Sequence, residues 1–260
     1  MSKQTLLGMA GLCVAAAVAL TACGGGTGSG PQKAGTAVSA TPSPSKPFEG
    51  QSAAQIAAKS RVTMRNLKSF KAKGTLTSEG RRMTVDMVFA GKGNCLGTFG
   101  FQSGTGQIRW YGGDTYMKGD KKFWQLLAGD QKGVSPQKAG AISELLSGRW
   151  LKMPAGSMDT DENLPSCDAA AIFTKDSPDS SLARGADTSV NGRRAVTLTG
   201  KDGAATHTLV VAAEGEPYQL RMTTKGGGEP ETLELSAFNK PVTLTPLSAD
   251  DVLDLGKLQH

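Results

Sequence analysis

Hydrophobic and polar residues alternate over much of the chain after residue 69, in short runs separated by turn residues. Over residues 83–89, for example, Met, Val, Met and Phe alternate with Thr, Asp and Val. A period of two places one apolar face and one polar face on a strand. Similar runs lie at residues 70–76, 99–101, 108–110, 116, 196–198, 209–211, 218–222 and 233–235. These runs predict a long antiparallel sheet with one apolar face.

The pattern becomes helical before the first strand and again in the middle of the chain. Residues 51–67 carry apolar side chains at helical spacing without Gly or Pro. Asp120 is placed to cap a short helix, and Ser135-Pro136 opens another that ends before Gly148. The apolar stripe of the helix that Ser135-Pro136 opens is expected to comprise Ala139, Ile142, Leu145 and Leu146.

Two further short helices are expected, over residues 167–174 and from Ser248. Strands therefore flank a helical insert on both sides, which predicts an α+β domain. A sheet with one apolar face must bury that face. Short helices would cover it only in part, so the pattern leaves either a filled core or a cavity.

The first 23 residues have the pattern of a lipoprotein signal. Residues 6–20 form an apolar run that is too short for the roughly 30 Å core of a bilayer but suits a secretory signal. Leu20-Thr21-Ala22-Cys23 resembles a bacterial lipobox, in which a cysteine accepts diacylglycerol. We expect residues 1–22 to be removed and Cys23 to anchor the protein on the extracytoplasmic face of the cell membrane. An ordinary cleaved signal followed by an incidental cysteine is the alternative.

Residues 23–50 are rich in Gly, Ser and Pro, which predicts a flexible tether. One domain is expected over residues 51–260, because neither a second linker nor a repeat of fixed period is evident. Cys95 and Cys167 are the cysteines of that domain. In an exported protein the two are expected to form a disulfide, and two free buried thiols are the alternative.

Composition narrows the possible functions. The chain has 260 residues, with 29 Lys and Arg against 23 Asp and Glu, and this small excess is too scattered to indicate a nucleic-acid partner. With 34 Gly and 12 Pro, the sequence is rich in turn residues. Two His residues leave little material for acid–base catalysis or a metal site.

Motifs of enzymes are weak. Ser135 and Lys138 have the Ser-x-x-Lys spacing of penicillin-interacting enzymes, but the partner motifs are missing. Asp159, Asp161 and Glu162 form an acidic stretch whose spacing matches no EF-hand. We interpret His207 as a structural or exposed residue of a strand. The prediction is a protein without enzymatic activity, cofactor or metal.

Several motifs, in their order along the chain, resemble the actinobacterial LppX/LprG-type lipoproteins. Besides the lipobox and the tether, they are Ser69 to Gly74, Asp114 to Lys118 with Trp124, Gly148 to Pro154, Val190 to Gly192, Pro217 to Leu220 and Asp250 to Leu255. The resemblance covers roughly residues 51–258. It implies the LolA-like fold, a curved antiparallel half-barrel of about eleven strands with helices packed on its concave face.

The resemblance also implies a function, namely carriage of acylated lipids or glycolipids in an apolar cavity towards the outer envelope. Candidate lining residues are Leu76, Val85, Met87, Phe89, Phe99, Phe101, Trp110, Ile142, Leu145, Leu146 and Leu220; each could instead be an ordinary core residue. We expect a monomer whose partners are the membrane and the lipid. The alternative is a sensor or interaction lipoprotein with a packed core, no lipid ligand and a partner protein in the envelope.

Overall fold

The computed structural model describes residues 47–78, 80–129, 131, 133–153, 167, 172–173 and 181–258. The chain from Ser45 onward forms one compact unit. Cys23, the signal sequence and most of the expected tether lie outside the described residues, as do the acidic stretch 159–162 and most of the helix expected over 167–174. In the described part of the chain, no helix has the length and apolar character needed to cross a bilayer.

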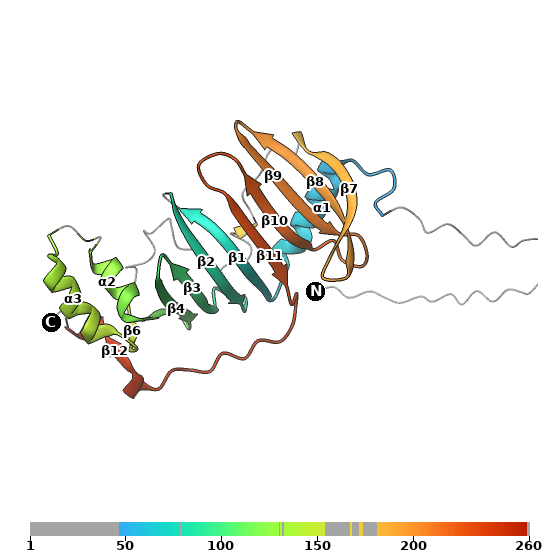
Figure 1. Cartoon of the computed structure of the whole chain (residues 1–260). Coiled ribbons are helices and arrows are strands. Elements are labelled where there is room, and N and C mark those ends of the chain that lie inside the picture. The colour runs from blue at the N-terminus through green and yellow to red at the C-terminus, as the bar shows by residue number, and fades with distance from the viewer. Residues whose placement is uncertain are drawn as a thin grey trace, which may run out of the picture. The chain divides into compact units, whose positions relative to one another are not determined.

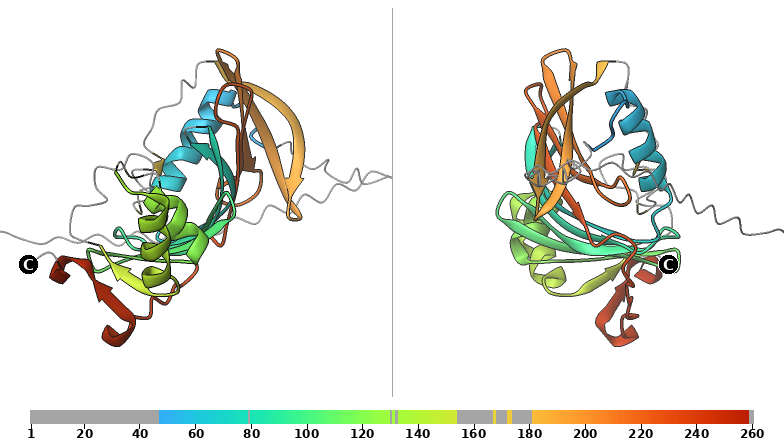
Figure 2. Two further views of the ribbon diagram at one scale, coloured as in Figure 1. Left: turned by 60° about the vertical axis from the view of Figure 1, so that its left-hand side comes forward. Right: turned by 90° about the vertical axis from the view of Figure 1, so that its right-hand side faces the viewer.

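Twelve strands form a single curved sheet, with helices on its concave face (Figures 1 and 2). The strands are β1 Phe70–Ser78, β2 Arg81–Phe89, β3 Cys95–Phe101, β4 Gly104–Tyr111, β5 Asp114–Gly119, β6 Trp150–Lys152, β7 Ala183–Val190, β8 Arg193–Asp202, β9 Ala205–Ala212, β10 Gln219–Lys225, β11 Glu231–Ser236 and β12 Val252–Asp254. Their order in the sheet is β12-β6-β5-β4-β3-β2-β1-β11-β10-β9-β8-β7. Neighbouring strands are antiparallel except β12 and β6. The predicted α+β half-barrel is thereby confirmed.

The helices begin where the sequence places caps. They are α1 Ala53–Arg65, α2 Lys121–Gly129 and α3 Pro136–Leu146. Ser52 and Gln55 form a reciprocal capping box at α1. The Asp120 carboxylate accepts from the Phe123 amide at 2.7 Å, and the Ser135 hydroxyl accepts from the Lys138 amide at 3.3 Å. Ser135 thus caps α3 by accepting from the Lys138 amide, as its place before Pro136 in the sequence predicts.

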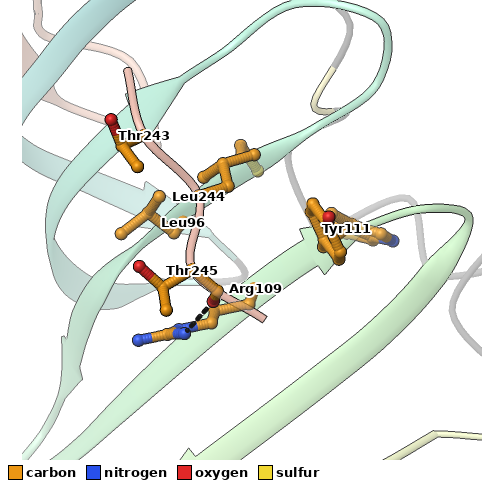
Figure 3. A pocket seen from close by; sticks show the side chains of 8 residues that line it. Leu96, Arg109, Tyr111, Thr243, Leu244 and Thr245 are labelled. Atoms are coloured by element: carbon orange, nitrogen blue, oxygen red, sulfur yellow. Dashed lines mark hydrogen bonds between the residues drawn. The ribbon is translucent and has the colours of Figure 1, made fainter. Parts of the chain in front are cut away.

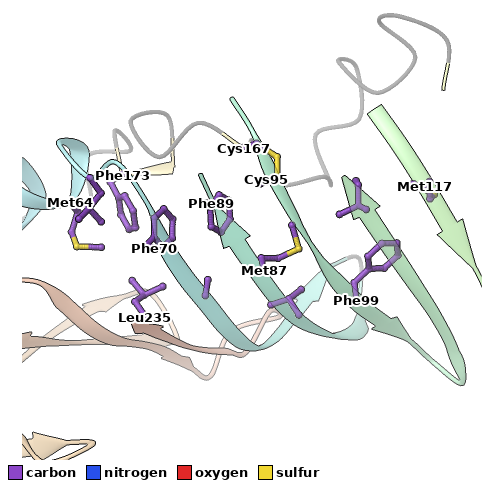
Figure 4. Packing of buried hydrophobic residues seen from close by; sticks show 14 of the residues in the cluster. Met64, Phe70, Met87, Phe89, Cys95, Phe99, Met117, Cys167, Phe173 and Leu235 are labelled. Atoms are coloured by element: carbon purple, nitrogen blue, oxygen red, sulfur yellow. A yellow bond between two sulfur atoms is a disulfide. The ribbon is translucent and has the colours of Figure 1, made fainter. Parts of the chain in front are cut away.

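One face of the sheet carries the core. The main buried cluster joins apolar residues of β1 to β6 and β11 with Met64 of α1 and with Phe123 and Trp124 of α2. Phe70 stacks on Phe89 with ring centroids 4.3 Å apart (Figure 4). A second cluster packs Ala53, Ile56 and Ala57 of α1 against Val196, Leu198 and Val211. Since α1 and α2 pack on the same face, the helices divide the concave surface between them.

Cys95 and Cys167 are bonded, with their Cα atoms 5.4 Å apart (Figure 4). This confirms the predicted pairing. Both cysteines are buried beside the aromatic residues of the main cluster. The bond therefore joins β3 to a segment 72 residues further along the chain, on the core side of the sheet.

Some local predictions were wrong. Leu145 was placed on the buried stripe of α3, but its side chain is 60% exposed, while Ala139 and Ser143 are buried. The helix expected from Ser248 is a single 3-10 turn over Ala249–Asp251, followed by strand β12. The segment that follows β11 runs to the edge of the sheet beside β6, where β12 pairs with β6.

Candidate functional site

The concave face changes in character along the direction of its strands. Near one end of the strands its residues are buried, as Phe70, Phe89, Leu235 and Val211 are. These side chains pack against each other and against the helices. This end of the concave face is protein core.

Beyond the buried zone, the same face carries a row of apolar side chains that are only partly buried. We call it the half-exposed row; it consists of Phe101, Met83, Leu76, Leu233, Met222 and Leu209. These residues come from six strands that are consecutive in the sheet, β3, β2, β1, β11, β10 and β9. Met83 lies opposite both Phe101 and Leu76, and Met222 lies opposite both Leu233 and Leu209. Between β1 and β11, Leu233 lies opposite Gly74, so the two halves of the row are offset by two residues and meet through the diagonal neighbours Leu76 and Leu233.

Polar side chains lie beside the row on the same face, two residues further along each strand towards its end. His207 lies opposite Thr224, and Thr224 lies opposite Glu231. The Thr224 hydroxyl donates to a Glu231 carboxylate oxygen at 3.2 Å and lies 3.0 Å from Nδ1 of His207. On β2, the Arg81 guanidinium lies 5.2 Å from the centre of the Phe101 ring. The concave face therefore passes from core, through a half-exposed apolar strip, to a polar rim.

Aromatic rings close the concave face at the α2 end. Phe123 contacts Phe99 and Trp124 edge to face, with ring centroids 5.3 Å and 5.0 Å apart. Strand glycines make room for these rings, because a Cβ on Gly119 would overlap Phe123 and a Cβ on Gly106 would overlap Phe99. Close backbone approach of this kind is a recognised use of glycine inside strands. Some of the glycines of the sequence thus have a packing role on the concave face.

The candidate lining residues fall into three groups. Val85, Met87, Phe89 and Phe99 are buried members of the main cluster, and Leu76, Trp110 and Leu146 pack against it while partly exposed. Phe101 and Ile142 are partly exposed as well. The structure does not bring Leu145 or Leu220 into this group. Leu145 is exposed, and Leu220 belongs to a separate buried cluster with Val210 and Ala195.

Four residues of the half-exposed row were not among the candidates: Met83, Leu209, Met222 and Leu233. Each occupies an apolar position of an alternating run, so the period of two was a sufficient signal for its face. What the sequence lacked was the strand order, because β1 of the first half pairs with β11 of the second. Only that pairing joins the two halves of the row.

A small pocket lies where the segment after β11 passes β3 and β4. Arg109 donates from Nη1 to the carbonyl oxygen of Thr245 at 3.0 Å, and Leu96 and Leu244 line the same pocket (Figure 3). Its volume is about 100 Å³. Ligand pockets usually measure about 300–1,000 Å³, so this one is too small for an acylated lipid. We interpret the contact as the attachment of the C-terminal segment to the sheet.

Groups suited to catalysis or metal binding are sparse in the described residues. No three His, Cys, Asp or Glu side chains in these ranges converge as metal ligands would. His207 lies on the polar rim and its side chain is exposed. The exposed part of the concave face is thus formed by the apolar row and its polar rim.

These features define the class of the fold: a LolA/LprG-like half-barrel, in which a curved antiparallel sheet surrounds helices. The sequence matches neither a known protein-family model nor a curated protein. Several solved structures, in contrast, are similar to this chain in fold.

The chain superposes on LprF from Mycobacterium bovis with a TM-score of 0.50, covering 75% of this chain and 96% of LprF at 12% sequence identity. The lipoprotein LppX from Mycobacterium tuberculosis aligns with a TM-score of 0.45 and 14% identity, over 74% of this chain and 97% of LppX. An uncharacterized conserved protein from Thermus thermophilus aligns with a TM-score of 0.36 and 13% identity, over 78% and 99% of the two chains. At such identities the likeness to LprF concerns the fold alone. It confirms the fold that the motif resemblance implied.

Proposed function

We propose that this chain is an exported lipoprotein, anchored through acylated Cys23, that binds acylated lipids or glycolipids on its concave face and carries them in the cell envelope. It acts as a monomer at the extracytoplasmic face of the membrane and needs no catalytic step or cofactor. One observation carries the proposal, namely the half-exposed row with its polar rim. The lipobox pattern at residues 20–23 and the shared fold with LprF support it.

The physical basis of binding is removal of apolar surface from water. Burial of apolar surface contributes about 25 cal/mol per Å², on the lipid as well as on the protein. Acyl chains would lie along the row from Leu209 to Phe101, between the two helix-covered ends of the concave face. A hydrated headgroup would meet the polar rim, where Arg81, Glu231 and Thr224 offer donors and acceptors.

The test uses the compact unit from Ser45 to His260, produced in a lipid-synthesising host. Native mass spectrometry is expected to detect co-purified lipid, and the delipidated protein is expected to bind a labelled acylated glycolipid. Met222→Glu places a charge in the row and should weaken glycolipid binding at least about tenfold, since a buried unpaired charge is costly. Thr223→Glu is the matched control, because Thr223 is the next residue on β10 and its side chain points to the opposite face.

A second candidate function is an interaction or sensor lipoprotein with a packed interior. The observation in its favour is the burial of Val85, Met87, Phe89 and Phe99, with α2 rings filling the space over the glycines. A folded domain that carries no lipid, and whose glycolipid binding is absent or equal in the Met222 and Thr223 variants, would support this alternative and contradict the carrier proposal.

A further inference from the structure

The opposite face of the sheet carries an apolar cluster of its own. Val210 and Ala195 are buried there, while their neighbours Val211 and Val196 point to α1. Because side chains alternate along a strand, the cluster lies on the face turned away from the helix. Tyr218 and Phe238 pack against this cluster and also against the main cluster.

A pocket of about 350 Å³ opens at this cluster. It lies at the ends of strands β7, β8, β10 and β11, whose positions can be followed in Figure 1. Val190 and Leu220 of this cluster and Leu235 of the main cluster supply apolar lining, and Leu220 is only 2% exposed. The volume falls within the usual range of about 300–1,000 Å³ for small-molecule sites. The pocket therefore has room for part of an apolar ligand.

Aromatic rings form part of the pocket's wall. Tyr218 and Phe238 stack with centroids 4.2 Å apart and an angle of 9° between their planes. The residues on either side of Phe238 both have left-handed backbone, with φ of 52° at Ala237 and 55° at Asn239. Alanine is unfavourable in this region, because its Cβ comes too close to the backbone carbonyl oxygen. A strained turn thus presents the Phe238 ring to the pocket.

Hydrogen bonds hold the strained turn in place. The Asn239 amide donates to the Ser69 carbonyl at 2.8 Å, and its side-chain oxygen accepts from the Lys68 amide at 2.8 Å. The Ser69 hydroxyl donates to the Lys240 carbonyl at 2.5 Å. The wall is therefore attached to the start of β1, which favours a preformed site.

Two cations stand at the rim of the pocket. Arg193 lies 5.7 Å from the centre of the Tyr218 ring, and Lys240 lines the pocket as well; both residues are exposed. The neighbouring Arg194 is paired with Glu214 at 3.2 Å. No such ion pair involves Arg193 or Lys240 within the ranges that the structure describes. An arginine fork and a lysine over an apolar floor are complementary to a carboxylate or phosphate that carries a hydrocarbon chain.

We propose that this pocket binds a monomeric anionic lipid, with its acidic head between Arg193 and Lys240 and its chain against Leu220 and the Tyr218–Phe238 pair. The site borders the main cluster through Leu235 and the Tyr218–Phe238 pair, but it shares no residue with the half-exposed row and does not depend on the carrier function. It would give the protein a second lipid-recognition site, selective for charge.

The test applies a photoreactive, diazirine-bearing palmitic acid and its methyl ester to the Ser45–His260 unit, followed by peptide mapping of the cross-links. The acid is expected to label the segments 218–220 and 235–240, and the ester much less. Arg193→Ala combined with Lys240→Ala should reduce this labelling at least about tenfold, because both charged donors to the acidic head are removed. Arg194→Ala is the matched control and should leave the labelling unchanged.

Three outcomes would overturn the proposal: no label in these segments, equal labelling by acid and ester, or equal labelling of the double variant. Circular dichroism of each variant checks that the exposed substitutions leave the domain folded. Labels on β9, β10 and β11 positions of the half-exposed row report the concave site in the same samples. The Met222→Glu variant should reduce only those, so failure of one site can be distinguished from failure of the other.

Discussion

At the β4–β5 end of the concave face, the rings of Phe99 and Phe123 rest on strand glycines, whereas at the β8–β9 end aliphatic residues of α1 pack on valines and a leucine. Rings that lie over glycine backbone have little freedom to move, because the glycines have no side chain that can shift. Aliphatic side chains on both partners can adjust by small movements. The two ends of the concave face are therefore covered by two kinds of packing, and the half-exposed row lies between them.

The largest expected effect separates these two kinds of packing. Phe123→Ala should destabilise the domain by about 5 kcal/mol, the upper part of the range for such changes, because Gly119 beneath the ring has no side chain that could fill the cavity. Ile56→Ala at the α1 end should cost about 3 kcal/mol, since its neighbours can close around the space. Urea unfolding of the Ser45–His260 unit measures both. A larger loss at Ile56 than at Phe123 would contradict the comparison.

A smaller effect is expected at the glycines themselves. Gly106→Ala should cost about 2 kcal/mol, because the added methyl group meets the Phe99 ring and forces an overpacked arrangement. Gly140→Ala is the matched control: Gly140 lies inside α3, and a Cβ there meets nothing within 4 Å. In that helix the same substitution should stabilise by about 0.5–1 kcal/mol. Equal effects at the two glycines would show that packing does not select Gly106.

The smallest effect concerns a polar contact at the α2 end, on the face away from the core. Lys152 donates to Asp114 at 2.8 Å, and Tyr116 donates to the same carboxylate oxygen at 3.2 Å. Burial and, next, the Asp114 charge raise the pKa of Tyr116 above its usual 10.0, while the hydrogen bond with Asp114 chiefly raises the pKa of Lys152 above 10.5. The folded state therefore holds both protons more tightly than the unfolded state does.

This contribution to stability is fully present below about pH 10 and is lost as the pH rises through the two raised pKa values. Because the groups are partly exposed, the loss should stay below about 1 kcal/mol. Asp114→Asn should flatten the alkaline part of the stability profile, measured as urea midpoints at several pH values. An unchanged alkaline profile in that variant would remove Asp114 as the cause.

Much of the fold was predictable because its signals are local. Alternation at residues 83–89 determined which side chains of β2 share a face, and the Asp120 and Ser135 caps determined where α2 and α3 begin. The predicted pairing of Cys95 with Cys167 depended on export and on cysteine number. For all of these, short-range sterics, hydrogen bonding or redox chemistry is sufficient.

Strands β6, β7 and β12 were not predicted, for physical reasons. β6 and β12 have three residues each, too few to show a period. β7 is an edge strand whose residues are exposed up to Val190, so neither of its faces selects apolar side chains. Their strand conformation comes from pairing with distant partners, which a local pattern does not contain.

For the candidate site, the sequence by itself determined the composition of the two faces, and the tertiary structure decided what those faces form. A bulge between Gln219 and Arg221 interrupts the alternation on β10, and Leu220 belongs to the cluster with Val210 and Ala195. Pairing of β1 with β11 joined six separate apolar residues into one row. Alternation is a property of each strand, whereas a binding surface depends on which strands are neighbours, and only long-range backbone pairing and packing specify that.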